Sequence, residues 1–333
     1  MTPANEFPAR ALVADIGGTN ARFAVADLES FTLSEIRHVL CVRHPSLAVA
    51  MLDYLKGLEH PPHHAAIAVA APVTGEEIRL TNSPWSFVRR DLCRAAGLDG
   101  VLVLNDFEAL ALSLPHLDPD ELAQIGGTEP VLHAAKIVLG PGTGLGVASL
   151  VWSQAGWVAV PGEGGHVTLG AHNARELALI EHLRKGRDHL SVERALSGLG
   201  LPDLYQAVAA NTERSAEALT PSEVVARAMS GSDPAAAESL DLFITWLGRF
   251  AGDVALVLGA RGGVYLGGGI PPKLLPQLTA GAFRQAFEAK GRMGALLAPI
   301  PVYVILAEFA ALKGAAAGLR NALRTTGAGI TRV

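Results

Sequence analysis

Residues 14–24 read Ala14-Asp15-Ile16-Gly17-Gly18-Thr19-Asn20-Ala21-Arg22-Phe23-Ala24. A similar stretch occurs later in the chain, Val138-Leu139-Gly140-Pro141-Gly142-Thr143-Gly144-Leu145-Gly146-Val147-Ala148. Each copy is an apolar run, a glycine turn that contains Thr, and a second apolar run. Such a strand pair can bring backbone N–H groups and a hydroxyl against a phosphate group. Two copies therefore predict two similar halves that face one nucleotide.

The composition favours a globular protein of two domains. The chain has 333 residues, half of them hydrophobic and 18% charged, with a formal net charge of −5. No dense run of Lys or Arg suggests a nucleic-acid surface, and no apolar segment suggests a signal peptide or a membrane span. Cys41 and Cys93 are the only cysteines, too few for a disulfide framework. We therefore expect a cytoplasmic protein without nucleic-acid or membrane partners.

Short apolar runs alternate with segments of helical periodicity, which predicts an α/β fold. The expected strands are Ala11–Ala14, Phe23–Ala26, Ile36–Val42, Ala65–Ala71, Val101–Leu104, Ile137–Leu139, Trp157–Val160, Val264–Leu266 and Val302–Leu306. The expected helices are Leu47–Leu58, Phe87–Ala96, Phe107–Leu114, Ala174–Asp188, Ser191–Gly198, Leu204–Ala210, Pro234–Leu258 and Glu308–Leu323. With a seam near Pro115–Asp118, we expect a small domain of residues 1–116, completed by 308–333, and a large domain of 117–307.

Asp106 is a candidate general base. The buried run Leu102-Val103-Leu104 stops at Asn105-Asp106, which places a carboxylate at the C-terminal edge of a sheet, where ligands of α/β proteins bind. Asp106 also begins a helical pattern, so the competing interpretation is a capping Asp. A base here would take the proton of a substrate hydroxyl during phosphoryl transfer.

A second polar group lies in Pro161-Gly162-Glu163-Gly164-Gly165-His166, a glycine-rich loop that suits hydrogen bonding to a polyol. The competing interpretation of this loop is a surface turn. Glu193 follows Ser191, and by itself that pattern favours a first-turn Glu after a Ser cap. A zinc site is disfavoured because no further Cys or close His completes a ligand set.

These motifs together resemble bacterial glucokinase, the non-zinc type related to hexokinase. The resemblance runs from about Leu12 to Leu323, with the motifs in order. They are Asp15–Arg22, Leu104-Asn105-Asp106, Gly140–Gly146, Glu163–His166 and Glu193-Arg194-Ala195-Leu196-Ser197-Gly198. The resemblance implies the two-domain actin-like, ribonuclease H-like ATPase fold with a cleft between the domains. It also implies ATP and Mg²⁺, D-glucose as the acceptor, and a homodimer.

The resemblance also implies roles for single residues. Asp106 matches the catalytic base. Sugar ligands are implied at Asn82, Asn105, Asp106, Glu163, His166 and Glu193. Nucleotide contacts are implied at Ala14, Asp15, Ile16, Gly17, Gly18, Thr19, Asn20, Gly142, Thr143, Gly144, Gly267, Gly268 and Gly269. No protein group is expected to bind the metal directly, and Asp15 is expected to reach Mg²⁺ through water.

Two segments depart from the family pattern. Leu199 stands where the family commonly has Pro, and Ala307–Gly314 replaces a Pro-Gly turn with a more helical sequence. A related family of sugar kinases and repressors is disfavoured, because residues 167–200 contain no Cys and no N-terminal DNA-binding helix pair is evident. Two alternatives stay open: a kinase for another hexose or with polyphosphate as donor, and a sugar- and ATP-binding sensor without turnover.

Overall fold

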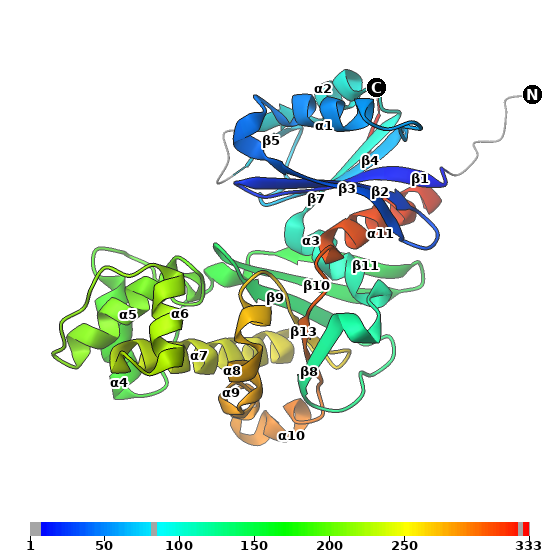
Figure 1. Cartoon of the computed structure of the whole chain (residues 1–333). Helices are drawn as coiled ribbons and strands as arrows, with labels where there is room; N and C mark the ends of the chain where they lie inside the picture. Colours follow the sequence, from blue (N-terminus) through cyan, green and yellow to red (C-terminus); the bar gives the residue numbers. More distant parts are fainter. Residues whose placement is uncertain (1–7, 81–84, 326–328, 333) are drawn as a thin grey trace, which may run out of the picture. The chain divides into compact units, whose positions relative to one another are not determined.

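The computed structural model describes residues 8–80, 85–325 and 329–332. These residues form two compact units (Figure 1). Unit 1 comprises the described residues of Met1–Asp118, Trp157–Ala159 and Ala307–Val333, and unit 2 comprises Pro119–Gly156 and Val160–Leu306. Each unit is described by itself below.

Unit 1 is built on a six-stranded sheet with helices on both faces (Figure 1). The sheet order is β14 (Ile330–Thr331), β7 (Gly100–Asn105), β4 (His64–Val69), β1 (Arg10–Ile16), β2 (Asn20–Asp27) and β3 (Leu33–Leu40). Helices α1 (Leu47–Lys56) and α2 (Arg89–Ala96) lie over one face, and α3 (Asp106–Ser113) and α11 (Ala310–Arg324) over the other. A small second sheet pairs β5 (Glu77–Arg79) with β6 (Ser86–Val88), and short 3-10 turns span Cys41–Arg43 and Leu114–His116.

Strand β1 shows why this sheet is covered on both faces. Its residues from Ala11 to Ala14 are completely buried, as is Ile16. Side chains alternate along a strand, so Leu12, Ala14 and Ile16 share one face, where they join a core with residues of α1. A continuous apolar run is typical of a strand that is buried on both sides.

Unit 2 is built on a second six-stranded sheet. The sheet order is β11 (Gly156–Gly162, of which Trp157–Ala159 are counted with unit 1), β10 (Leu145–Ser153), β9 (Lys136–Pro141), β12 (Val264–Leu266), β13 (Val302–Ile305) and β8 (Leu122–Gly126). The helices are α4 (Ala174–Arg184), α5 (Gly200–Asn211), α6 (Pro221–Ser230), α7 (Pro234–Leu258), α8 (Leu275–Thr279), α9 (Ala282–Glu288) and α10 (Gly294–Leu297). Short 3-10 turns span Pro119–Glu121, Gly164–His166, Val192–Arg194, Pro271–Leu274 and Gly291–Met293.

The two sheets repeat one topology. In each sheet an antiparallel hairpin, β1–β2 or β9–β10, is continued on its first strand by two parallel strands, β4 and β7 or β12 and β13. Each sheet then ends in an antiparallel edge strand, β14 or β8. The prediction of two similar α/β halves is therefore confirmed.

Most predicted elements are present, and three predictions need correction. The expected helix Ser191–Gly198 is wrong, because the chain there makes only the 3-10 turn Val192–Arg194. Phe87 belongs to β6, so α2 begins at Arg89. The last helix begins at Ala310, and Ala307–Phe309 is not helical. Leu199, the other departure from the family pattern, precedes α5 and is 68% exposed.

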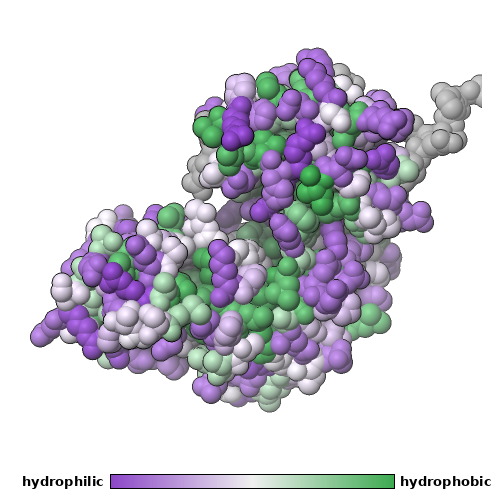
Figure 2. Space-filling model, in the orientation of Figure 1, coloured by the Kyte–Doolittle hydropathy of each residue, from purple (hydrophilic) through white to green (hydrophobic). Residues whose placement is uncertain are grey.

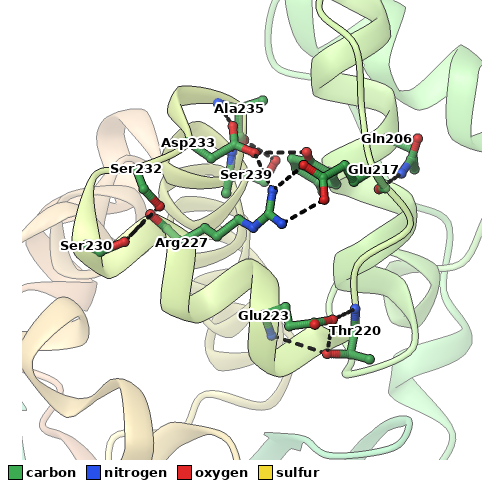
Figure 3. Close-up of polar contacts among 12 residues, drawn as sticks. Gln206, Glu217, Thr220, Glu223, Arg227, Ser230, Ser232, Asp233, Ala235 and Ser239 are labelled. Atoms are coloured by element: carbon green, nitrogen blue, oxygen red, sulfur yellow. Dashed lines mark hydrogen bonds and ion pairs between the residues drawn. The ribbon is translucent and has the colours of Figure 1, made fainter.

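The helices beside the second sheet are joined by a polar network (Figure 3). Thr220 and Glu223 form a capping box at the start of α6. Arg227 of α6 donates two hydrogen bonds to Glu217, at 3.0 and 2.8 Å. Asp233 caps α7 and accepts a hydrogen bond of 2.9 Å from the Tyr205 hydroxyl of α5. These contacts join α6 to the segment before it and the start of α7 to α5.

Hydrophilic side chains cover most of the face in Figure 2, with smaller hydrophobic patches between them. Many of the apolar residues are accordingly packed in the cores of the two units. Within the described ranges, none of the helices combines the length and apolar character needed to span a bilayer.

Candidate functional site

The first glycine turn joins β1 to β2 in unit 1. Gly17 N donates to Asn20 O at 2.9 Å, and Thr19 O accepts a hydrogen bond of 2.9 Å from Cys41 N. Thr19 and Asn20 are exposed, and Gly17 and Gly18 are partly exposed. Ala14 and Ile16 are completely buried, so at these two predicted nucleotide contacts neither the side chain nor the backbone reaches the surface.

Asp15 is paired with Arg22 across the same hairpin. The two residues are directly opposite in the strand register, and Arg22 Nη1 lies 2.9 Å from Asp15 Oδ2. Burial raises the pKa of the Asp15 carboxyl, and the neighbouring Arg22 guanidinium acts in the opposite direction. Sequence reasoning assigned no role to Arg22. The pair could have been predicted from the hairpin register, which places Asp15 directly opposite Arg22.

Asn105 caps the helix that begins with Asp106. Asn105 Oδ1 accepts hydrogen bonds from Phe107 N and Glu108 N, and the Glu108 side chain accepts from Asn105 N, which completes a capping box. Asn105 Nδ2 donates to Ala71 O at 3.3 Å. The interpretation of Asp106 as the cap is therefore wrong. Asn105 is the cap, so the Asp106 carboxylate is not needed as the N-cap of this helix.

Asp106 lies at the C-terminal edge of the first sheet, together with Asp15. Strands β1, β4 and β7 are parallel, so their ends meet at one edge. Asp106 Oδ1 accepts a hydrogen bond of 3.0 Å from Phe107 N. Burial raises the pKa of Asp106 to about 6, opposed by that hydrogen bond and reinforced by the negative charge of Asp15. A carboxyl with this pKa is mostly ionised at neutral pH and suits a general base.

The second glycine turn and the third glycine loop lie side by side in unit 2. The turn Gly142-Thr143-Gly144 joins β9 to β10, with a bond of 2.8 Å from Gly142 N to Gly144 O and with Thr143 exposed. Gly267-Gly268-Gly269 follows the neighbouring parallel strand β12, and Gly267 N donates to Leu139 O at 2.9 Å. The three predicted nucleotide segments thus divide into one in unit 1 and two adjacent ones in unit 2.

The loop that carries Glu163 and His166 packs directly against strand β10. A Cβ on Gly165 would overlap Leu145 O, and one on Gly164 would come within 3.0 Å of the Val147 side chain. Glycine is therefore required for the close approach, and the loop is more than a surface turn. Glu163 and His166 are both exposed, with Glu163 Oε2 3.8 Å from His166 Nε2.

Glu193 lies against the second glycine turn. Its Oε2 accepts a hydrogen bond of 2.8 Å from Leu145 N. Ser191, the residue before the 3-10 turn, makes no side-chain cap bond. Ser191 is thus the N-cap residue and Glu193 lies in the first turn, as that pattern predicted, but the Glu193 carboxylate binds the distant Leu145 amide. Sequence reasoning missed Leu145, since nothing in its residue type indicates that its amide binds a carboxylate.

Two remaining predictions concern Asn82 and the metal. Asn82 lies outside the described residues. Within the described ranges, no group of three His, Cys, Asp or Glu side chains could hold a metal ion.

Comparisons with known proteins identify the family. The family model described as Glucokinase matches residues 12–322. A glucokinase from Aromatoleum aromaticum is 49% identical over 315 residues, which cover 94% of this chain and 95% of that protein. The crystal structure of a glucokinase from an Antarctic psychrotroph is 35% identical with a TM-score of 0.87, covering 94% of this chain and 99% of that one.

A more distant structure shares the fold. A ROK family glucokinase from Streptomyces griseus, solved in complex with glucose and AMPPNP, is 20% identical with a TM-score of 0.62 and covers 92% of this chain and 98% of that one. The fold is thus the two-domain actin-like ATPase fold of these sugar kinases. The family match over nearly the whole chain shows that this protein belongs to the glucokinase family.

Proposed function

We propose that this enzyme transfers the γ-phosphoryl group of ATP to the 6-hydroxyl of D-glucose, giving glucose 6-phosphate and ADP, the first step of glucose use in glycolysis. Glucokinase relatives at 44–49% identity support the reaction. The observation that carries the mechanism is the Asp106 carboxylate, held at the start of α3 with a pKa of about 6 while Asn105 does the capping.

Asp106 acts as the general base. As the sugar oxygen forms its bond to the γ-phosphorus, the hydroxyl proton passes to the Asp106 carboxylate. The bond from that phosphorus to the bridging oxygen breaks, and ADP leaves with the electron pair. Because the transition state is loose, the proton departs late and a base with a pKa near 6 is strong enough.

The sugar is held by hydrogen-bonding side chains. We propose Asn82, Asn105, Glu163, His166 and Glu193 as its ligands, beside Asp106. Two observations support this assignment: Glu163 and His166 are exposed, and Glu193 Oε1 binds none of the residues that the structure describes. A site of such groups rejects a sugar that lacks one hydroxyl by roughly 10⁴-fold, because a buried polar group would lose its partner.

The phosphates are held by the glycine segments. We propose backbone contacts from residues 17–20, 142–144 and 267–269, with the exposed hydroxyls of Thr19 and Thr143. Asp15 is the residue that would hold a magnesium ion here, and it would do so through water, because Arg22 already engages its Oδ2 atom. Bound Mg²⁺ supplies neutralisation of phosphate charge, and Asp15 would orient its water shell.

We further propose that the protein is a cytoplasmic homodimer whose functional domains are 1–116 with 308–333, and 117–307. The resemblance to bacterial glucokinase supports the dimer, and the buried free thiols of Cys41 and Cys93 suit a reducing compartment. Light scattering on the purified protein measures its mass against the 34.6 kDa of one chain.

The decisive test is Asp106→Ala in a coupled assay for ADP. We expect kcat to fall by about 10²–10⁴-fold, the usual contribution of a positioned base. Asp53→Ala removes an exposed carboxylate of the same unit and is the matched control. Activity of Asp106→Ala within tenfold of the wild type, with an unchanged circular dichroism spectrum, contradicts the assignment of the base.

The same assay decides between the open alternatives. A panel of glucose, mannose and glucosamine, each with ATP or polyphosphate, is compared by kcat/KM. If another combination of sugar and donor gives a higher kcat/KM than glucose with ATP, that combination is the substrate pair. Tight binding of glucose without release of ADP would instead indicate a sensor.

A further inference from the structure

Leu145 lies between the two segments that carry the proposed sugar ligands of unit 2. It is the first residue of β10 and directly follows the second glycine turn. Its amide N donates to Glu193 Oε2 at 2.8 Å, and its carbonyl O is so close to Gly165 that a Cβ there would overlap it. One residue of the second glycine hairpin thus contacts both segments through its two backbone groups.

The segment that carries Glu193 is also joined to its surroundings at other points. Gly198 N donates to Gly142 O at 2.8 Å, in the same glycine turn. Val192 N donates to Val167 O at 2.9 Å, which joins this segment to the one that carries His166. The turn and both sugar-ligand segments therefore form one hydrogen-bonded assembly.

The two glycines of the turn differ in their relation to Glu193. A Cβ on Gly144 would overlap Glu193 Oε2, whereas a Cβ on Gly142 would meet no atom within 4 Å. Neither glycine has a positive φ, so the difference between them is the contact with Glu193 and not backbone strain. Gly144→Ala and Gly142→Ala are therefore a matched pair of substitutions, of which only the first disturbs Glu193.

We propose that Glu193 is a positioning residue that couples sugar binding to the second phosphate turn through Leu145. This inference rests on the proposed function, in which Glu193 accepts a sugar hydroxyl. Oε2 holds the turn, and Oε1, which has no partner among the described residues, is available to the sugar. A sugar on Oε1 and a phosphate on the turn therefore act on the same carboxylate, so the binding of either ligand changes the affinity for the other.

Thermodynamic linkage makes this coupling reciprocal. If the nucleotide raises the affinity for glucose by some factor, glucose must raise the affinity for the nucleotide by the same factor. We expect a factor of about 5–50 in the wild type, within the usual range for coupled sites. Calorimetric titration with glucose, with and without saturating AMPPNP and Mg²⁺, measures it without turnover.

The matched variants separate the coupling from simple loss of a ligand. Gly144→Ala displaces Glu193, so we expect it to weaken glucose binding in the absence of nucleotide by about tenfold, a loss of about 1.4 kcal/mol. Gly142→Ala changes the same turn without touching Glu193, so we expect wild-type affinity for glucose and a change only in AMPPNP binding.

Glu193→Gln tests the carboxylate without adding an atom. The amide oxygen of Gln can accept from Leu145 N or from a sugar hydroxyl, but its other terminal atom is only a donor. We expect the protein to fold with an unchanged melting temperature and the coupling factor to fall to within twofold of one. This variant keeps the test decisive if Gly144→Ala does not fold.

Three results would overturn the coupling. The first is a folded Gly144→Ala variant that binds glucose as tightly as the wild type does. The second is an unchanged coupling factor in Glu193→Gln. The third is a wild-type protein that binds glucose and AMPPNP without either ligand changing the affinity for the other. Absence of glucose binding in the wild type would overturn the proposed function itself, and the coupling with it. The two failures are therefore distinguishable.

Discussion

The two glycine hairpins share a sequence pattern and a place in the sheet but are stabilised differently. The first hairpin carries its own charge pair, Asp15 and Arg22, on opposite strands. Residues 138–148 of the second contain no charged side chain, and a carboxylate reaches this hairpin from Glu193, 48 residues after Leu145. The two hairpins thus share a pattern of strand pairing but receive their charged groups from different parts of the chain.

This difference indicates a division of labour between the units. In unit 1 the charge of Asp15 acts on Asp106, the base of the proposed proton transfer. In unit 2 the charge is that of Glu193, which we propose to bind the sugar, so the binding of the sugar acts directly on this charge. The predictions below test this division, from the largest expected effect to the smallest.

The largest effect is expected from pH. Burial and the charge of Asp15 raise the pKa of Asp106 to about 6, and only the ionised carboxylate can accept a proton. Below that pH, kcat/KM should therefore fall about tenfold for each unit, and it should be level above pH 7. Rates with glucose from pH 5 to pH 8 give the profile, with circular dichroism at each pH as the control. A profile that is flat down to pH 5 contradicts the role of unit 1.

An intermediate effect is expected from Arg22→Ala. The change leaves the partly buried Asp15 carboxylate without its partner, so we expect a loss of about 1–2 kcal/mol in the free energy of unfolding. We also expect kcat to fall by about tenfold, with partial recovery in Arg22→Lys, which restores the charge without the planar fork.

The control for this prediction is Arg94→Ala. It breaks an exposed ion pair with Asp91 on α2, which should change the free energy of unfolding by about 0–1 kcal/mol. Urea unfolding and steady-state rates measure the two quantities. Equal losses in Arg22→Ala and Arg94→Ala would show that the pair in the first hairpin has no special importance.

The smallest effect is expected from Thr19→Ala and Thr143→Ala. Both side chains are exposed at equivalent places in the two turns, and each would lose one hydrogen bond to phosphate, about 0.5–1.5 kcal/mol. We expect KM for ATP to rise by about 3–10-fold in each variant, with no change in melting temperature. An effect in only one of the two would show that the turns are not equivalent toward the phosphates.

The sequence predicted the repeated core of the fold well, because its signals are local. The glycine turns, the apolar runs of β1 and β9 and the helix Pro234–Leu258 can be identified from neighbouring residues alone. The edge strands β8 and β14 were missed, since a strand such as Ile330–Thr331 exists only by pairing with a distant strand, here β7. The site residues likewise divide into those with a local sequence signal and those without one. Asp106 follows from the end of a strand, whereas the bond from Leu145 N to Glu193 has no local signature.

The segment around Glu193 shows why a helical pattern can mislead. Residues 191–198 have residues suited to a helix, yet only Val192–Arg194 forms a turn. Backbone groups that a helix would use internally instead bond outward, as in the bonds from Val192 N to Val167 O and from Gly198 N to Gly142 O. Tertiary contacts have overridden a local preference at a place where we propose that function needs the side chain.

The position of α11 in unit 1 has a consequence for synthesis on the ribosome. This helix packs against α3 so closely that a Cβ on Gly314 would overlap Ala109 O, and α3 begins with Asp106. The N-terminal strands are made first, but the layer that covers them and supports α3 comes from residues 310–324. All of unit 2 is therefore translated before the sheet of unit 1 can be fully covered. Until residues 310–324 emerge, that sheet exposes apolar surface on which the nascent chain can aggregate.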